Sequence, residues 1–168
     1  MRTILFFQDE TQLDEIETIR QKHDPLFGLI KPHITLVFPF ESAISKDALK
    51  QHIIEKVEGI PPIAIEFTNH IRNEGEYIFL NVEKGKEQVK KLHDTLYEGP
   101  LAEFLRSDIP YIPHVTVGRK ENEKQAIEIV EKMPRLSMRL RCLIEKVSIE
   151  RIGESGESII EFEVELSK

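Results

Sequence analysis

Two short segments of the 168-residue sequence repeat the same residue types in the same order. Residues 32–36 read Pro-His-Ile-Thr-Leu, and residues 113–117 read Pro-His-Val-Thr-Val. In a β-strand, side chains two residues apart lie on the same face. Each segment, as a strand, would therefore direct an imidazole and a hydroxyl to one side and two aliphatic side chains to the other. Two such strands side by side would gather two imidazoles and two hydroxyls around one spot.

This set of side chains suits a displacement at phosphorus. Histidine is the side chain whose ordinary pKa, about 6.5, allows it to take or give a proton near neutral pH. Of His33 and His114, a neutral ring could take a proton from water while a charged ring protonates the leaving oxygen. The hydroxyls of Thr35 and Thr116 could donate to non-bridging phosphate oxygens. The reaction would require no metal, no cofactor and no covalent intermediate.

Two other interpretations of the repeated segments remain open. A single His-x-Thr triplet is common by chance, and both prolines could merely begin strands in which each histidine satisfies a buried hydrogen bond. A metal site is the second alternative. However, His33 and His114 lack a third ligand at a recognisable spacing, so no metal ligands are assigned.

Composition limits the class of partner. The formal net charge of −7 argues against a protein that coats long nucleic acid, because such binding neutralises many phosphates. This charge is compatible with a small anionic substrate.

Cys142 is the one cysteine, so no disulfide can form within the chain. The apolar run at residues 3–7 is interrupted by Asp9 and Glu10, too short for a signal sequence or membrane span. We expect a reduced cytoplasmic protein with no membrane partner, and favour a monomer.

Periodicity and turn residues predict alternating strands and helices. Side-chain caps are expected at Asp9 or Thr11, at Ser45 and at Asn122. A change in the parity of the apolar residues predicts a bend near Glu145. The expected strands cover residues 3–8, 29–38, 61–67, 77–82, 111–118, 136–144, 147–149 and 160–166, and the expected helices cover 13–23, 46–58, 89–97, 101–105 and 123–133.

The order of these elements favours an α+β fold with mainly antiparallel strands. No linker or low-complexity run divides the chain, and the repeated strand and its following helix recur 81 residues apart. We therefore expect residues 1–168 to form a single domain of two pseudo-symmetric lobes. Each lobe would contribute an antiparallel sheet with outer helices, and the two His-x-Thr strands would line a central cleft.

The segments at residues 32–36 and 113–119 resemble the paired signatures of the 2H phosphoesterase superfamily, in particular the bacterial 2′-5′ RNA ligase-like (LigT-like) branch. The resemblance extends over essentially the whole chain in length, motif separation and element order. It implies a bilobal α+β fold and the opening of 2′,3′-cyclic phosphates or related cyclic nucleotides. It also implies that His33 and His114 are the general acid and base, in an order left open, and that Thr35 and Thr116 orient the phosphate.

Other candidates are less specific. Arg119 matches the basic residue that often follows the second motif, although its odd offset from His114 would aim it away from the cleft in an ideal strand. Tyr111 and Phe38 could stack on a base, or pack in the core. Arg139 and Arg141 could reach a phosphate, or cover a solvated strand face. The remaining histidines, at positions 23, 52, 70 and 93, are interpreted as structural or surface residues.

The resulting prediction is a metal-independent phosphodiesterase that opens the 2′,3′-cyclic phosphate of a small nucleotide or an RNA 3′ end, with reversible 2′-5′ RNA ligation as a related activity. The alternative is a binding module that uses the same cleft to hold a nucleotide or RNA end without turnover.

Overall fold

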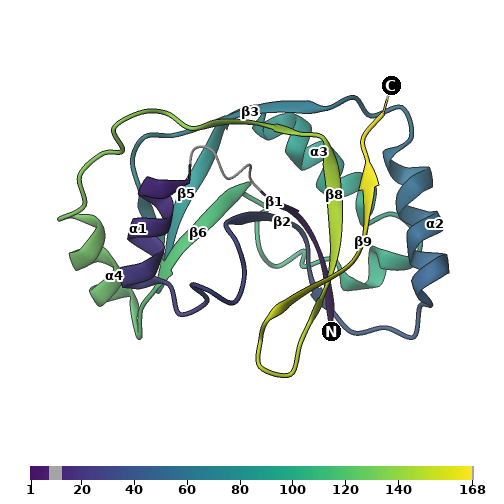
Figure 1. The fold of residues 1–168 in the computed structure, drawn as a ribbon, viewed down its shortest axis with the longest axis horizontal. Coiled ribbons are helices and arrows are strands. Elements are labelled where there is room, and N and C mark those ends of the chain that lie inside the picture. Colours follow the sequence, from purple (N-terminus) through teal and green to yellow (C-terminus); the bar gives the residue numbers. More distant parts are fainter. Residues whose placement is uncertain (8–12, 168) are drawn as a thin grey trace.

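The computed structural model describes residues 1–7 and 13–167. Helices and strands are interspersed along them (Figure 1), with three consecutive strands in two places. In chain order they are β1 (Arg2–Phe7), α1 (Asp14–His23), β2 (His33–Phe40), α2 (Lys46–Val57), β3 (Ile63–Phe67), β4 (Arg72–Glu74), β5 (Tyr77–Lys84), α3 (Lys86–Leu96), the 3₁₀ helix η2 (Gly99–Phe104), β6 (His114–Arg119), α4 (Glu123–Val130), β7 (Arg141–Ile144), β8 (Lys146–Ile152) and β9 (Ser158–Glu165).

The strands form one curled sheet. Its order is β7-β3-β5-β6-β2-β1-β8-β9, with β4 paired to β5. Each of these neighbouring pairs is antiparallel. The predicted α+β class with antiparallel strands and outer helices is confirmed. The two sets of strands that we expected as separate sheets are joined where β2 pairs with β6 at the middle of the order.

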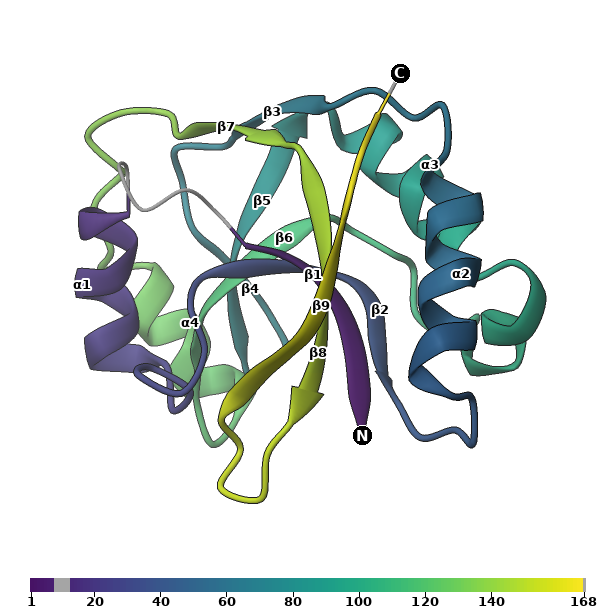
Figure 2. The same ribbon diagram turned by 45° about the vertical axis from the view of Figure 1, so that its right-hand side comes forward.

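The helices flank the sheet in two pairs, with α1 and α4 on one side and α2 and α3 on the other (Figures 1 and 2). Helix α1 packs on β6, and α3 packs on β2. The aliphatic residues that follow each motif histidine are completely buried in the core: Ile34, Leu36, Val115 and Val117. The helices therefore cover the aliphatic face of the motif strands and leave the opposite face to the histidines and threonines.

Gly118 allows α1 to approach β6 closely. A Cβ atom at this position would lie 2.9 Å from the Cβ of His23 and 3.1 Å from its carbonyl oxygen. Atoms cannot approach so closely without displacement, so any larger residue would push the helix off the strand that carries the second motif.

Two of the expected helix caps are confirmed. The Ser45 hydroxyl accepts a hydrogen bond from the amide of Ala48, and the Asn122 side chain accepts one from the amide of Gln125. The caps proposed at Asp9 and Thr11 lie outside the described residues.

Several strand boundaries differ from the prediction, among them the start of β6, which begins at His114 instead of residue 111. Strand β2 begins at His33 and continues through Pro39 to Phe40, which pairs with Arg2 across a register irregularity in β1. Proline is tolerated where the ladder is irregular because no amide is required of it there. The strand predicted from residue 136 begins only at Arg141.

The segment before β7 keeps only part of the expected alternation and has no continuous ladder, because Met138 is 61% exposed. Leu136 and Leu140 are buried, and each makes one backbone hydrogen bond, Leu136 N to Asn69 O and Phe67 N to Leu140 O. The expected bend at Glu145 is confirmed, because β7 ends at Ile144 and β8 begins at Lys146.

Candidate active site

The two motif strands meet at one pair of residues. Ile34 of β2 lies opposite Val115 of β6 in antiparallel register. Antiparallel geometry then sets His33 across from Thr116, and Thr35 across from His114. The four polar side chains thus form the corners of a quadrilateral on one face of the sheet, with the two histidines at diagonal corners.

Burial follows the same alternation in both motifs. His33, Thr35, His114 and Thr116 are each partly exposed, whereas the intervening Ile34 and Val115 are inaccessible. Local sequence explains this, because alternation of polar and β-branched residues is typical of a strand with one face in the core. Both imidazoles are thus accessible from the same side of the sheet.

Each imidazole is held in the same way. Nδ1 of His33 lies 2.8 Å from the carbonyl oxygen of Lys31, and Nδ1 of His114 lies 2.6 Å from that of Ile112. A carbonyl oxygen can only accept, so Nδ1 carries the proton in both rings. In the neutral form, Nε2 of each ring therefore presents a lone pair, and in the charged form it presents a proton.

The surroundings lower the pKa of both imidazoles below its ordinary value. Burial lowers the pKa of His33, and the charges of Arg20 and His114 lower it further, while the hydrogen bond to Lys31 and the charge of Asp24 act in the opposite direction. Burial also lowers the pKa of His114, against the hydrogen bond to Ile112 and the charge of Glu74.

A buried arginine holds the loop that leads into the first motif. Arg20 of α1 is 2% exposed, and its guanidinium donates to Asp24 at 2.7 Å and to the carbonyl oxygen of Ile30 at 2.7 Å. It also pairs with Glu17. Because a buried guanidinium must be fully paired, this network fixes the path of residues 24–30 immediately before the motif.

The rings beside the two histidines were not predicted from the sequence. The ring of Phe79, on β5, lies against His114 with centroids 3.7 Å apart and planes inclined by 31°. The ring of Phe7, on β1, meets His33 edge-on at 6.1 Å. The strand register explains why these rings lie beside the histidines, since Phe7 pairs with His33 and Phe79 with Thr116. Sequence alternation shows which residues of one strand share a face, but the neighbouring strand must be known before residues of two strands can be placed on the same face.

A bulge brings Arg119 to the face of the motif. Tyr77 and Phe79 lie on the same face of β5, and they pair with Arg119 and Thr116, so β6 contains one extra residue between these pairs. The guanidinium of Arg119 lies 4.9 Å from the centre of the Tyr77 ring and 3.4 Å from Glu76. The odd offset expected to aim Arg119 away from the cleft is therefore compensated by the bulge.

Tyr111 is a packing residue rather than a surface for a base. Its ring is stacked on His93, with centroids 3.7 Å apart and planes inclined by 15°, and Phe38 meets it edge-on. Its hydroxyl donates to the carbonyl oxygen of Thr35 at 2.8 Å. Burial raises the pKa of the Tyr111 hydroxyl, so it remains a proton donor throughout the working range.

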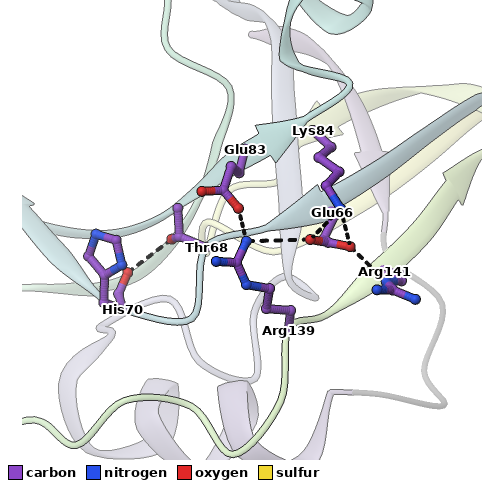
Figure 3. A network of polar contacts seen from close by, with 7 residues as sticks. All are labelled: Glu66, Thr68, His70, Glu83, Lys84, Arg139 and Arg141. Atoms are coloured by element: carbon purple, nitrogen blue, oxygen red, sulfur yellow. Dashed lines mark hydrogen bonds and ion pairs between the residues drawn. The ribbon is translucent and has the colours of Figure 1, made fainter.

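Arg139 and Arg141 lie around a buried carboxylate (Figure 3). Glu66 of β3, with a side chain only 7% exposed, accepts from Arg141 Nε at 2.7 Å and pairs with Lys84 and Arg139. Arg139 also contacts Glu83. Hydrogen bonding from Lys84, helped by Arg141, lowers the pKa of the Glu66 carboxyl against its burial. The two arginines are therefore structural partners of Glu66 rather than a purely solvated strand face.

A cavity of about 1230 Å³ borders the first motif. Phe7, Lys31 and Pro32 line it next to His33, and Arg141 and Lys146 line it further away. None of the four motif side chains lies in its wall, so the cavity adjoins the quadrilateral of motif residues and does not contain it. Its volume exceeds the range typical for small ligands, about 300–1,000 Å³.

His52, His70 and His93 are placed as the sequence suggested, whereas His23, expected at the surface, is half-buried. His52 and His93 are buried, with contacts to the Leu96 carbonyl and the Asp94 carboxylate respectively. His23 packs against Gly118, and His70 is exposed.

Among residues 1–7 and 13–167, no group of three or more histidine, cysteine or carboxylate side chains is arranged to hold a metal ion. Over the same residues, no helix has the length and apolar character required to cross a membrane.

A curled antiparallel sheet with two His-x-Thr strands paired at its centre defines a 2H phosphoesterase. The chain belongs to the 2′-5′ RNA ligase superfamily, whose family model matches residues 7–156. The predicted superfamily is confirmed.

Named proteins and solved structures are also similar to the chain. A protein named as a phosphoesterase in Bacillus licheniformis is 26% identical over 132 residues, which cover 76% of this chain and 75% of that protein. A second phosphoesterase, in Geobacillus thermodenitrificans, is 31% identical over 121 residues, which cover 69% of this chain and 67% of that protein. The structure of E. coli LigT complexed with NADP+ matches the fold with a TM-score of 0.62 at 17% identity, covering 100% of both chains. Family membership and these names support phosphoesterase activity.

Proposed function

We propose that the chain is a metal-independent cyclic phosphodiesterase that opens 2′,3′-cyclic phosphates of nucleotides or RNA ends, with reversible 2′-5′ RNA ligation as a related activity. One observation carries this proposal. Both imidazoles are fixed through Nδ1, so that each turns a neutral or protonated Nε2 to the same face as the two threonine hydroxyls.

In the proposed reaction, a water oxygen attacks phosphorus and loses a proton to Nε2 of the neutral imidazole. The bond from phosphorus to one ribose oxygen breaks, and that oxygen receives the proton from Nε2 of the charged imidazole. The histidines end with exchanged protonation states and are restored by solvent. Thr35 and Thr116 donate to the non-bridging oxygens and hold the phosphate in line. In ligation, a ribose hydroxyl takes the place of water as the attacking group, and the same P–O bond of the cyclic phosphate breaks.

Charge and the structural neighbours support the proposed substrate class. A net charge of −7 favours a small nucleotide or an RNA terminus over a folded RNA. LigT structures of this fold were solved with NADP+, 3′-AMP and ATP. We further infer a single domain of two pseudo-symmetric lobes, one carrying each motif strand, that acts as a monomer on an RNA 3′ end or a free nucleotide.

The second candidate function is a binding module that holds a nucleotide without turnover. It is favoured by the lowered pKa of both His33 and His114, because two neutral imidazoles lack the proton that the leaving oxygen requires. A bound phosphate would reverse this effect, since a neighbouring negative charge favours the charged imidazole. We therefore retain catalysis as the leading proposal.

The test is a screen of the purified protein, with EDTA, against 2′,3′-cyclic nucleotides, RNA with a cyclic phosphate end and ADP-ribose cyclic phosphate. We expect turnover in the wild type and losses of about 10²–10⁴-fold in each of His33→Ala and His114→Ala. The double variant should lose little more than either single variant, because the two groups act in one step.

His70→Ala is the matched control, since His70 is exposed and lies outside the motifs. It should retain wild-type activity. Full activity in either motif variant would refute the mechanism. Tight binding of the nucleotides without turnover on any substrate would establish the binding module instead, and activity that disappears with EDTA would indicate a metal-dependent hydrolase.

A further inference from the structure

Asn81 of β5 occupies a position beside the motif that the proposed mechanism does not use. It pairs with His114 in the ladder between β5 and β6. Because paired residues of antiparallel strands direct their side chains to the same face, the Asn81 amide lies on the face of the imidazole. His114 in turn lies across from Thr35, so one row across the sheet reads Asn81, His114, Thr35.

The backbone around Asn81 is fixed on both sides. Its carbonyl oxygen accepts from the amide of Thr68 at 2.9 Å, and the next residue, Val82, donates its amide to the carbonyl oxygen of Pro113 at 2.9 Å. Pro113 directly precedes His114. The same ladder therefore fixes the position of Asn81 relative to the imidazole, and the side chain has little freedom to leave this face.

The Asn81 side chain presents a buried acceptor that lacks a partner. In the part of the chain that the structure describes, Oδ1 is buried and makes no hydrogen bond. An unsatisfied buried acceptor is costly, and nearly all such atoms in proteins are paired. No described residue supplies the donor, and an N–H or O–H group of a bound ligand would satisfy this oxygen.

The chemistry of the proposed site identifies that donor. Opening of a 2′,3′-cyclic phosphate leaves the phosphate on one ribose oxygen and a hydroxyl on the adjacent carbon. This hydroxyl lies next to the phosphate and therefore next to His114. It carries a proton that an amide oxygen can accept, and a neutral amide cannot remove that proton.

We propose that Asn81 recognises ribose, with Oδ1 accepting a hydrogen bond from the hydroxyl adjacent to the phosphate of the bound ribonucleotide. This inference rests on the proposed function for the location of the phosphate. It adds a ribose-specific contact supplied by β5, a strand that carries neither motif. The contact forms only after the ring has opened, so it favours the opened ester over the cyclic phosphate.

The test measures binding and does not require turnover. Adenosine 3′-monophosphate and its 2′-deoxy analogue are titrated calorimetrically against the wild type, Asn81→Leu and Asn81→Asp. The wild type should bind the ribonucleotide about tenfold more tightly, the effect of one hydrogen bond to an otherwise unpaired buried group. Asn81→Leu should lose this preference and bind the two nucleotides equally. Asn81→Asp should keep the preference, because it retains an acceptor, while binding both more weakly through repulsion of the phosphate.

Asn73→Leu on β4 is the matched control, because the Asn73 amide donates within its own turn to Gly75. It should retain the wild-type preference. Equal binding of both nucleotides by the wild type, binding of neither, or a preference that survives in Asn81→Leu would overturn the proposal. If Asn81→Leu does not fold, the proposal is still tested by the ratio of the two affinities in the wild type and in Asn81→Asp.

The two proposals can fail separately. Ribose preference that depends on Asn81, without turnover of any cyclic phosphate, would retain the ribose contact and reject the phosphodiesterase. Turnover that depends on both histidines, with no effect of Asn81→Leu on the ribose preference, would retain the phosphodiesterase and reject the ribose contact.

Discussion

The hydroxyl of Tyr111 donates a hydrogen bond to the carbonyl oxygen of Thr35 at 2.8 Å and thereby links the segment before the second motif to the backbone of the first. Tyr111 precedes Ile112, whose carbonyl oxygen accepts from His114 Nδ1. One side chain is thus connected to both halves of the proposed site. Stacking of His93 on the Tyr111 ring holds this connection against α3.

We expect Tyr111→Phe to lower kcat by about 3- to 10-fold with little change in KM, because loss of one hydrogen bond, about 0.5–1.5 kcal/mol, loosens the relative position of the two histidines. Steady-state kinetics on a cyclic nucleotide would measure this. The pH of maximal activity should not change, since neither imidazole loses a partner. A shift of the pH optimum would assign Tyr111 a direct role in proton transfer.

Tyr97→Phe provides the comparison. Its hydroxyl accepts a hydrogen bond from the amide of Phe38 at 2.9 Å, on the same strand but beyond the motif. Thermal unfolding should show a similar loss of stability in both variants, whereas kcat should fall only in Tyr111→Phe. Equal losses of kcat would mean that general stability of β2, and not the contact at Thr35, limits the reaction.

The motif strands could be predicted because their chemistry and their burial follow the same alternation. His33 and Thr35 lie on one face and Ile34 on the other, as strand periodicity requires. The caps at Ser45 and Asn122 were predictable for a similar reason, since each depends on residues within one helical turn. Local patterns thus established the elements and the candidate acid–base pair.

The neighbours of the motif could not be predicted, because they depend on strand order and register. Phe79 and Asn81 are ordinary residues of an alternating strand until β5 is placed beside β6. The direction of Arg119 depends on a single extra residue in a ladder, which no local pattern records. Arg139 and Arg141 appeared solvated because their partner, Glu66, lies far away in sequence.

The pH dependence of activity should reflect the lowered pKa of both motif histidines. Burial places the pKa of each below the ordinary value of 6.5. The active form of the free enzyme has one proton on the pair, so kcat/KM should follow a bell with its maximum below pH 6.5. The optimum of kcat should lie at higher pH, because the bound phosphate favours the charged imidazole. A maximum of kcat/KM above pH 7 would contradict the neutral assignment of the two rings.

Arg119 should contribute to binding more than to catalysis. It lies on the motif face beside Tyr77, separated from His114 by Phe79. We expect Arg119→Gln to raise KM about 3- to 10-fold with a small effect on kcat, the pattern of a contact made equally in ground and transition states. Arg119→Lys should restore part of the affinity because it retains the charge. A large loss of kcat in Arg119→Gln would place the guanidinium at the reacting phosphate.

Glu150 of β8 allows a test of how pH affects the stability of the β8–β9 hairpin at the edge of the sheet. Its side chain is buried, and its carboxyl accepts a hydrogen bond from the Ser158 hydroxyl. Burial raises the pKa of Glu150 above its ordinary value of 4.5, an effect that the Ser158 hydrogen bond opposes. The folded state therefore binds this proton more tightly than the unfolded state, so stability contributed by the protonated carboxyl is lost as pH rises through the folded-state pKa.

Glu150→Gln keeps an acceptor for Ser158 and removes the titration. We expect its Tm to exceed that of the wild type by about 2–4 °C at pH 8 and to approach it near pH 4. Glu163→Gln on β9 should behave oppositely, because Lys146 lowers the pKa of the Glu163 carboxyl and the ionised form is the stabilising one. Its Tm deficit should be present at pH 8 and disappear as the solution is acidified. Parallel pH profiles for the two variants would show that the burial of Glu150 does not govern its ionisation.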